Sequence, residues 1–390
     1  MERIRTSLSI ARDPWGSFEQ VHPVLLSDLK RVTQTFGLVQ YEQCLASCQY
    51  ALDYVWEKLN TGHWKDISDQ WRQIYYSVSY YKSVCLYELH HPPLKCIKTC
   101  DMGILMGVKP LKWDLCLKEL ASTLHKLHES TELVKDIPAA KIPRLELISP
   151  SKDKSIQRVS CPSLESFRKQ WLSIGQPVII TDCMHHWPAL DKWSLAYFQT
   201  VAGLRTVPVE IGSRYTDDDW SQQLLTISQF IQQYIVKHQA EGAPARRGYL
   251  AQHQLFDQIP ELRDDIIVPE YCCLGESPDP DINAWFGPEG TVSPLHQDPK
   301  DNLLCQVKGR KLVKLCPPDM ADCLYVNEGM LANTSQVDVE SIDLQKFPLA
   351  AKVSFTESVL HPGEMLFIPA KYWHHVRSLD LSFSVSFWWS

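Results

Sequence analysis

The sequence predicts an α+β protein in which an all-α N-terminal domain precedes a β-rich domain built as a double-sheet roll. Two patterns carry this prediction. Apolar residues recur every three or four positions in the first third of the chain, as on one face of a helix, and short apolar runs replace them afterwards. Many short strands with glycine and proline at their junctions are typical of a rolled antiparallel sheet rather than a parallel α/β fold.

Three helical stripes are predicted in the first third, the first ending near Gly62 and the second at Pro92-Pro93. Their members are Leu45, Cys48, Leu52, Val55 and Leu59; Trp71, Ile74, Val78, Tyr81 and Cys85; and Trp113, Leu117, Leu120, Leu124 and Leu127. Antiparallel helices with aromatic-rich interfaces resemble tetratricopeptide scaffolds, but no repeat of about 34 residues is visible. We therefore expect residues 1–140 to form a helical interaction or scaffold domain without chemistry of its own.

Helical periodicity stops where Pro138, Pro143 and Pro150 interrupt the chain, and residues 141–390 are expected to form the β domain. Strand-like runs cover residues 178–180, 205–211, 249–252, 282–286, 302–307, 311–316, 365–368 and 382–389. In the last run small polar residues alternate with large apolar ones, which gives the strand a polar face and an apolar face. Polar faces of this kind would line the interior of a barrel, where a metal site would lie.

The composition excludes several classes of protein. A formal charge of -7 argues against a basic face that binds nucleic acid, and it suits a cationic partner. The 13 cysteines are odd in number and include no Cys-x-x-Cys pair, no apolar leader follows Met1, and no run approaches the ~18 apolar residues of a membrane span. We therefore expect an intracellular protein with reduced cysteines and no direct contact with nucleic acid or membrane.

His296 and Asp298 form a His-x-Asp pair after a turn that contains glycine and proline. At the end of a strand, side chains two positions apart project to the same side. A third ligand would complete the 2-His-1-carboxylate face of non-haem Fe(II) oxygenases, which leaves positions open for a bidentate co-substrate and O2. The pair alone is weak, because 14 histidines and 46 acidic residues give roughly two such pairs by chance. A distal segment, Pro362 to Val376, adds to the evidence for a metal site.

Together these segments resemble the jumonji-C (JmjC) oxygenases. The resemblance rests on Ser293-Pro294-Leu295-His296-Gln297-Asp298, Pro362-Gly363-Glu364 and Trp373-His374, and it extends to residues 283–288, 333–338 and 387–390. It covers residues 148–390 and implies a double-stranded β-helix of the jelly-roll or cupin-like kind. It also implies a catalytic iron held by His296, Asp298 and His374, with 2-oxoglutarate and O2 consumed and succinate and CO2 released.

His375 competes with His374 for the third ligand position. Neighbouring residues on a strand point to opposite faces, so only one of the two can bind the metal. The family motif places the ligand directly after Trp373, which favours His374.

The resemblance also assigns 2-oxoglutarate to a set of pocket residues: Tyr249, Trp285, Ser293, Asn302, Lys311 and Trp388. Lys311 would pair with the distal carboxylate. The alternation of β-strand side chains places it with Val313 and Leu315 on an apolar face, which argues against the alternative of a solvated cluster of lysine and arginine. For the two tryptophans, packing in the core remains an alternative.

Glu210, Tyr215 and Trp220, with the acids of residues 217–219, form an acidic and aromatic lip that the resemblance places beside the substrate. A carboxylate with aromatic neighbours suits a planar guanidinium, whereas a methylated ammonium prefers an aromatic cage. We therefore predict hydroxylation of arginine side chains in a protein substrate. Demethylation of N-methyl-lysine, in histones for example, is the alternative, because it uses the same C–H oxidation. A merely solvated acidic loop is a third interpretation.

Other function classes fit less well. A non-catalytic β-barrel binding module should have lost a metal ligand or Lys311, and a hydrolase should contain a Gly-x-Ser-x-Gly elbow, which is absent. The chain stops after its last strand, without the C-terminal helices through which related hydroxylases dimerise, so we expect a monomer. The resemblance implies residence in the nucleus, and the cytoplasm is also compatible.

Overall fold

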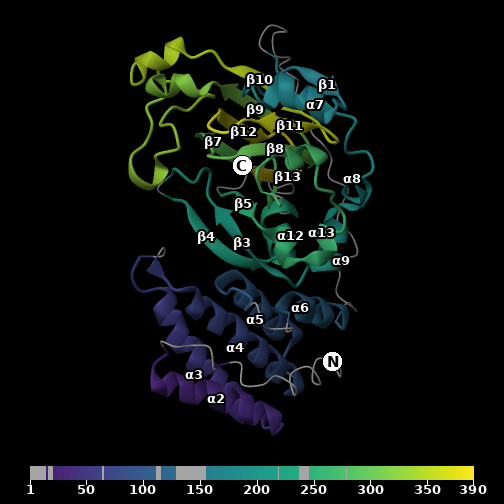
Figure 1. Ribbon diagram of the computed structural model, residues 1–390, viewed down its shortest axis with the longest axis vertical. Helices are drawn as coiled ribbons and strands as arrows, with labels where there is room; N and C mark the ends of the chain where they lie inside the picture. Colours follow the sequence, from purple (N-terminus) through teal and green to yellow (C-terminus); the bar gives the residue numbers. More distant parts are fainter. Residues whose placement is uncertain are drawn as a thin grey trace. The chain divides into compact units, whose positions relative to one another are not determined.

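The computed structural model describes residues 15, 21–63, 66–110, 116–128, 155–217, 219–236, 246–277 and 279–390. The chain divides into two compact units, Met1–Leu133 with Ala202–Val207, and Val134–Val201 with Pro208–Ser390 (Figure 1). The proline-rich boundary predicted near residue 140 lies outside the described residues, as do Trp113 and Asp218.

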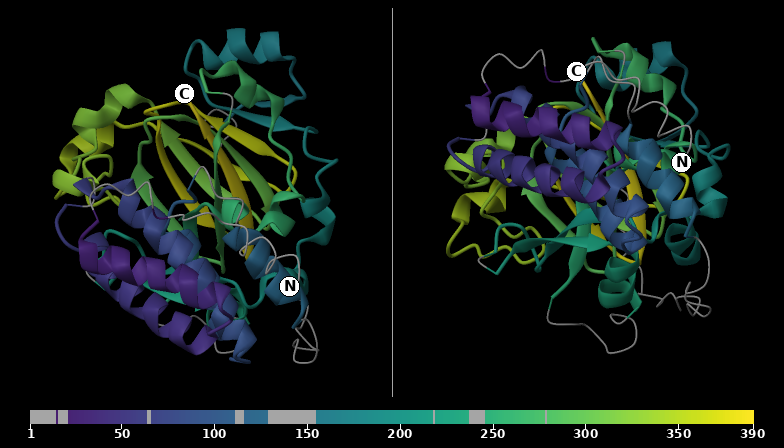
Figure 2. Two further views of the ribbon diagram at one scale, coloured as in Figure 1. Left: turned by 60° about the horizontal axis from the view of Figure 1, so that its bottom comes forward. Right: turned by 90° about the horizontal axis from the view of Figure 1, so that it is seen from below.

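Successive helices pack side by side in the first unit (Figure 2). They are α2 (Pro23–Gly37), α3 (Tyr41–Leu59), α4 (Asp69–Glu88), α5 (Pro93–Met106) and α6 (Leu117–Lys126). The three predicted stripes lie on α3, α4 and α6, whereas α2 and α5 were not predicted. The expected cap at Gly62 is wrong by two residues, because Asn60 caps α3 and Gly62 follows in a left-handed turn with φ 90°.

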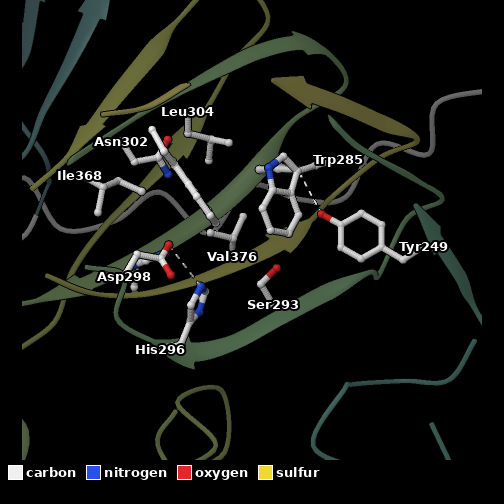
Figure 3. Close-up of a pocket in the computed structure, with 12 residues that line it drawn as sticks. Tyr249, Trp285, Ser293, His296, Asp298, Asn302, Leu304, Ile368 and Val376 are labelled. Atoms are coloured by element: carbon white, nitrogen blue, oxygen red, sulfur yellow. Dashed lines mark hydrogen bonds and ion pairs between the residues drawn. The ribbon is translucent and has the colours of Figure 1, made fainter. Parts of the chain in front are cut away.

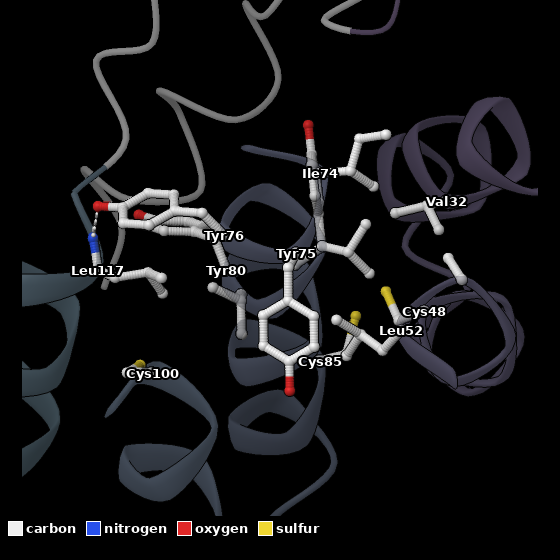
Figure 4. Close-up of a cluster of buried hydrophobic side chains, with 14 of the residues drawn as sticks. Val32, Cys48, Leu52, Ile74, Tyr75, Tyr76, Tyr80, Cys85, Cys100 and Leu117 are labelled. Carbon is white, nitrogen blue, oxygen red and sulfur yellow. Dashed lines mark hydrogen bonds between the residues drawn. The ribbon is translucent and has the colours of Figure 1, made fainter. Parts of the chain in front are cut away.

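Cysteine, tyrosine and aliphatic side chains share the core of this helical unit (Figure 4). Cys48 and Leu52 of α3 face Ile74 and Cys85 of α4, and all four are buried. The hydroxyl of Tyr76 accepts a hydrogen bond of 2.9 Å from the amide of Leu117, which fixes the start of α6. The stripe residues of the sequence thus pack in this unit, except Leu127, which is 52% exposed, and Trp113, which is not among the described residues.

A buried ion pair also stabilises the first unit. The guanidinium of Arg205 donates to Asp101 Oδ1 from Nε at 3.0 Å and from Nη2 at 2.8 Å. The amide of Thr206 donates to Asp101 Oδ2 at 2.6 Å. The side chains of Arg205 and Asp101 are 1% and 0% exposed, so the removal of one partner would leave an uncompensated charge.

Asp101→Ala is expected to lower the free energy of unfolding of the helical unit by about 3–5 kcal/mol, as the loss of one partner of a buried pair does. Urea denaturation followed by circular dichroism measures the change. The control is Glu165→Ala, which removes a solvent-exposed pair with Lys169 and should cost less than about 1 kcal/mol. Equal losses in the two variants would show that the buried pair has no special weight.

The second unit contains two sheets that face each other. The larger has nine strands in the order β1-β2-β11-β8-β13-β6-β5-β3-β4, and the smaller has four in the order β10-β9-β12-β7. The strands are β1 (Arg158–Ser160), β2 (Val178–Thr181), β3 (Thr206–Ile211), β4 (Ser221–Thr226), β5 (Gly248–His253), β6 (Asp281–Gly287), β7 (Val292–His296), β8 (Asp301–Lys308), β9 (Lys311–Cys316), β10 (Thr356–Leu360), β11 (Met365–Ile368), β12 (Trp373–Ser378) and β13 (Ser382–Trp389).

Short helices accompany the larger sheet: α7 (Leu164–Phe167), α8 (Pro188–Lys192), α9 (Leu195–Ala202), α10 (Ile227–Phe230), α12 (Leu255–Gln258) and α13 (Pro260–Arg263). Aromatic side chains cover the apolar face of β13. Trp193 lies 4.4 Å from Phe383 and Trp187 lies 5.9 Å from Phe387, measured between ring centroids. Both faces of β13 are therefore buried, and its polar face points to the space between the sheets, where Ser384 donates to Gln306 Oε1 at 2.6 Å.

An apolar cluster fills the space between the sheets. It includes Ile179, Leu304 and Leu366 of the larger sheet and Val313 and Leu315 of the smaller one. The predicted α+β class is confirmed, with helices first and a rolled pair of mostly antiparallel sheets second, in which β1 and β2 form a parallel pair. None of the helices among the described residues is long and apolar enough to cross a membrane.

Candidate metal centre and substrate pockets

Two histidines face each other across the antiparallel strands β7 and β12. His374 is the register partner of His296, and the centroids of their rings lie 4.1 Å apart. Asp298 follows two residues after the end of β7, and its carbonyl accepts a hydrogen bond of 2.7 Å from the amide of Lys371. The close-up in Figure 3 shows Asp298 beside His296 at the edge of the pocket.

The three predicted metal ligands come together in space. Nε2 of His374 lies 3.5 Å from Asp298 Oδ2, and Nε2 of His296 lies 3.9 Å from the same oxygen. One ligand atom from each residue lies within 4.8 Å of the others, and this is the one such group of three or more found among the described residues. The arrangement presents two imidazoles and a carboxylate to a common point.

Protonation states in this cluster suit metal binding. Nδ1 of His296 donates to the Pro294 carbonyl at 2.7 Å and Nδ1 of His374 donates to the Tyr372 carbonyl at 2.9 Å, which leaves both Nε2 atoms free to ligate. Burial and the nearby His374 lower the pKa of His296 to about 4. Burial would raise the pKa of Asp298, but the two histidines hold it below its ordinary value. The site therefore offers a neutral imidazole on His296 and an anionic carboxylate on Asp298.

The donor set fits Fe(II). Asp298 Oδ2 is buried and has no hydrogen-bond partner within the part of the chain that the structure describes. A buried carboxylate oxygen without a donor is costly unless a cation binds it. Two imidazoles and one carboxylate on one face, with the opposite positions open, are the ligands that Fe(II) takes in non-haem oxygenases.

His375 points away from this cluster. Its Nε2 lies 3.8 Å from Glu340 Oε1, and Arg377 Nε lies 2.7 Å from the same carboxylate oxygen. The alternation of side chains along β12 thus separates the two neighbouring histidines as expected. His374 points toward the candidate metal ligands, and His375 points toward the ion pair of Glu340 and Arg377.

A pocket of about 340 Å³ adjoins the candidate ligands (Figure 3). It is lined by His296, Asp298 and His374, by the six residues predicted to hold 2-oxoglutarate, namely Tyr249, Trp285, Ser293, Asn302, Lys311 and Trp388, and by Leu304, Ile368 and Val376. All nine predicted residues thus meet in one cavity. The three aliphatic residues were not singled out in the sequence, because single aliphatic residues within apolar strands carry no distinguishing signal.

Lys311 is 2% exposed, and its Nζ donates to the hydroxyl of Tyr249 at 3.2 Å. Because it is buried, the pKa of Lys311 falls to about 7. Arg310, by contrast, forms an ion pair with Asp380 at 2.7 Å, so the neighbouring cations do not share its environment. Lys311 therefore does not belong to a solvated cluster of lysine and arginine side chains. Its ammonium is suited to an anion that enters the pocket.

Two other polar atoms of the pocket have no hydrogen-bond partner within the described ranges. Asn302 Oδ1 and Trp388 Nε1 are buried without hydrogen-bond partners among the described residues. Trp285 Nε1, in contrast, donates to Ser386 Oγ at 2.9 Å, which fixes its ring against the cavity. A small ligand with carboxylate and keto oxygens would meet donors in Lys311 Nζ and Trp388 Nε1.

Glu210, Tyr215 and Trp220 line a second pocket of about 260 Å³. It shares Tyr249 with the first, and Glu210 is the register partner of Tyr249 across β3 and β5. Burial raises the pKa of Glu210, although contact with Trp220 opposes the shift. Arg214 and Arg247 also line this pocket, and neither was predicted.

Asp217 and Asp219, near this pocket in sequence, have surroundings that differ from those of Glu210. Asp219 lies 3.8 Å from Arg246, and both side chains are about half exposed, as in an ordinary surface pair. Asp217 does not belong to the lining of either pocket. Of the described acids at the predicted lip, Glu210 is therefore the one that the structure places in the second pocket.

Two contacts join the lip to the loop after β9. Tyr215 and Thr334 approach to 3.2 Å through their hydroxyls, and Arg214 forms an ion pair of 2.7 Å with Asp338. The same loop pairs with the end of β7, where the amide of Gln297 donates to the Asn333 carbonyl at 2.9 Å. The lip and the strand that carries His296 are thus bound to one loop.

Comparison with known proteins gives two family matches. Residues 164–390 match the cupin-like domain family, and residues 41–135 match the family described as KDM8-like, N-terminal ARM repeats. The second match corrects the tetratricopeptide resemblance of the helices, since the repeats are of the ARM kind. The structural reason is that both kinds stack antiparallel helices with apolar stripes, so periodicity alone does not separate them.

Several curated proteins are similar over most of the chain. Lysine-specific demethylase 8 of Danio rerio is 47% identical, with 88% of this chain and 86% of the relative covered. Lysine-specific demethylase 8 of Xenopus tropicalis is 42% identical, with 89% of each covered. Lysine-specific demethylase JMJ30 of Arabidopsis thaliana is 41% identical, with 88% and 86% covered.

Proposed function

The chain belongs to the lysine-specific demethylase 8 family of jumonji-C 2-oxoglutarate oxygenases, and we propose that it oxidises a basic side chain of a protein substrate bound beside Glu210. The observation that carries the proposal is the half-buried carboxylate of Glu210 with Trp220 and Tyr215 in the same pocket. This pocket shares Tyr249 with the cavity of the candidate metal ligands, so a side chain that pairs with Glu210 would lie next to that cavity.

We assign Fe(II) to His296, Asp298 and His374, and 2-oxoglutarate to the cavity that ends at Lys311. Bound together, Fe(II) and 2-oxoglutarate supply, with O2, the oxidation of an unactivated C–H bond, with succinate and CO2 released. The side chains of this protein bind and orient the substrate and the co-substrate, and they exclude water.

Lys311 neutralises the distal carboxylate of 2-oxoglutarate in an environment where an ion pair is strong, because water is excluded from it. Tyr249 holds the lysine Nζ in place through its hydroxyl. Leu304, Ile368 and Val376 supply apolar wall, which keeps the cavity dry around the reacting groups. Trp388 offers a buried N–H donor to the oxygens of the ligand.

The first candidate reaction is demethylation of N-methyl-lysine. Three relatives at 41–47% identity are named as lysine-specific demethylases, which supports this reaction more directly than any other. Oxidation of an N-methyl group gives a hydroxymethyl amine that releases formaldehyde. The aromatic rings of Trp220 and Tyr215 are compatible with an alkylated ammonium.

The second candidate is hydroxylation of an arginine carbon, the reaction that the sequence favoured. Glu210 is the specific observation for it, because a half-buried carboxylate beside aromatic rings suits a planar guanidinium, which it can bind through two parallel hydrogen bonds. Both reactions need a cationic substrate, and a net charge of -7 favours the approach of such a partner. We propose a monomer that acts on a protein in the nucleus, without direct binding of nucleic acid.

Peptide mass spectrometry tests the proposal. The purified protein would receive Fe(II), 2-oxoglutarate and O2, with a library of arginine peptides and N-methyl-lysine peptides offered together. Loss of one carbon and two hydrogens with formaldehyde release indicates demethylation, and a gain of one oxygen on arginine indicates hydroxylation. Each must be absent with His296→Ala. If peptides of neither kind are modified while 2-oxoglutarate is consumed, the proposed substrate class is wrong.

Glu210→Gln is expected to raise the KM for the peptide by about 10- to 100-fold, because a hydrogen bond to a charged group contributes about 1.5–3 kcal/mol. The KM for 2-oxoglutarate should stay unchanged, since that ligand occupies the other pocket. Steady-state kinetics with each substrate varied in turn measures both. Glu165→Gln, on an exposed helix, is the control. An unchanged peptide KM would remove Glu210 from the substrate site.

A further inference from the structure

Two cysteines meet at the outer edge of the nine-stranded sheet. Cys161 Sγ and Cys183 Sγ lie 2.7 Å apart, although the residues are 22 positions apart in sequence. Cys161 is exposed and Cys183 is partly exposed. The nearest comparable approach that involves two thiols, Cys44 to Cys48 at 4.0 Å, lies in the buried helical core. The pair at the sheet edge therefore combines close contact with access from solvent.

The strand pairing explains why these thiols meet. β1 and β2 are parallel, with Ser160 opposite Thr181, so both chains leave the sheet in the same direction. Cys161 follows β1 directly, and its amide donates to the Thr181 carbonyl at 3.1 Å. Its backbone is left-handed, with φ 37°, which turns the chain after the strand. The contact thus follows from the register of the sheet.

The side chain of Tyr271 lies next to the cysteine pair. The hydroxyl of Tyr271 donates to the Pro162 carbonyl at 2.8 Å and lies 3.6 Å from Cys183 Sγ. β1 itself is short, with three residues, and it is an edge strand that pairs with β2 alone. A covalent link at this point would fasten a weakly paired edge to the rest of the sheet.

We propose that Cys161 and Cys183 form a reversible disulfide when the protein meets a peroxide oxidant, and that the bond stabilises the edge of the catalytic domain. The inference does not depend on the proposed substrate. In a reducing compartment the pair stays as two thiols, and oxidation makes it a redox-responsive link.

The chemistry balances with hydrogen peroxide as the oxidant. The thiolate of Cys161 attacks one peroxide oxygen, the O–O bond breaks, and Cys161 becomes a sulfenic acid while hydroxide leaves and takes up a proton as water. Cys183 then attacks the sulfenic sulfur. The S–S bond forms, the S–O bond breaks, and the departing hydroxide takes the Cys183 proton as a second water. Burial raises the pKa of Cys183 and so lowers its thiolate fraction, which leaves the more exposed Cys161 as the thiol that meets peroxide first.

The bond should increase thermal stability. It closes a loop of 22 residues, and the loss of chain entropy in the unfolded state then favours folding. For a domain of this size the expected rise in Tm is roughly 5 °C or more, relative to the reduced protein.

The test oxidises the full-length protein with hydrogen peroxide, blocks remaining thiols, and digests it without reductant. A cross-linked peptide pair that contains Cys161 and Cys183, reversed by dithiothreitol, is expected together with the rise in Tm. Cys161→Ser should show neither the cross-link nor the rise. Cys273→Ser, at another exposed cysteine, should behave as the wild type.

Three results would overturn the proposal. Cys161 and Cys183 could end as separate sulfinic or sulfonic acids, the cross-link could join either of them to a different cysteine, or the Tm of the oxidised wild type could match that of oxidised Cys161→Ser. Cys183→Ser provides a second variant, so a folding defect at one position does not decide the outcome.

Discussion

His374→Gln is expected to lower metal affinity by at least about 100-fold and to abolish turnover, because it removes one of three ligands where the loss of an outer-shell partner already costs 10–100-fold. His374 faces His296 across two strands, and its Nε2 lies 3.5 Å from Asp298. Isothermal titration with Mn(II) or anaerobic Fe(II) measures the affinity, and succinate release measures the turnover.

The neighbouring substitution His375→Gln is the matched control. It makes the same chemical change at an equally buried position, but His375 faces Glu340 rather than the metal cluster. The metal affinity of this variant should therefore stay close to that of the wild type. If His375→Gln loses the metal while His374→Gln keeps it, the ligand assignment on β12 is reversed.

Lys311→Met is expected to weaken 2-oxoglutarate binding by about 10- to 100-fold while it stabilises the protein in the absence of ligand. The first effect follows from the loss of the buried ammonium that pairs with the distal carboxylate. The second follows because the wild-type ammonium is buried with a tyrosine hydroxyl as its hydrogen-bond partner. The KM for 2-oxoglutarate and urea denaturation measure the two effects.

The stability gain should depend on pH. Burial lowers the pKa of Lys311 to about 7, against about 10.4 in the unfolded chain. Below pH ~7 the lysine is charged in both states, so the wild type carries the full cost of burial and the methionine variant gains most. Between pH ~7 and ~10 the unfolded chain binds more protons, and the gain should decline. A gain that is constant across this range would contradict the buried-ammonium interpretation.

The metal site was accessible from the sequence because it depends on local geometry. His296 and Asp298 are two residues apart, so alternation along a strand predicts that they share one side. Alternation allows only one of His374 and His375 as the third ligand, and the family motif after Trp373 favoured His374. The pocket partners of this site were reached through family resemblance. Arg214 and Arg247 were missed, since a basic residue in a loop gives no sign of which cavity it enters until the loop is placed.

The class of fold was also accessible, but the order of its strands was not. Period-2 alternation marks β13, yet its position between β6 and β8 depends on pairings far apart in sequence. Helix α2 was missed although its buried residues Leu25, Leu29, Val32 and Phe36 form a regular stripe, whereas the buried face of α5 includes Asp101 and Gly103. In α5, for example, Gly103 is buried against Ser79 and Leu117, where a side chain would not fit. The contact between Cys161 and Cys183 likewise needed the register of β1 and β2.

An anaerobic titration tests the central claim most directly, namely that one cavity holds Fe(II) on His296, Asp298 and His374 and 2-oxoglutarate against Lys311. Chelation of a 2-oxo acid to Fe(II) produces a visible charge-transfer absorption band. The band should appear when 2-oxoglutarate is added to the Fe(II)-loaded wild type, need far more 2-oxoglutarate in Lys311→Met, and be absent in His374→Gln. Iron bound by the wild type without the band, or a band that persists in His374→Gln, would contradict the claim.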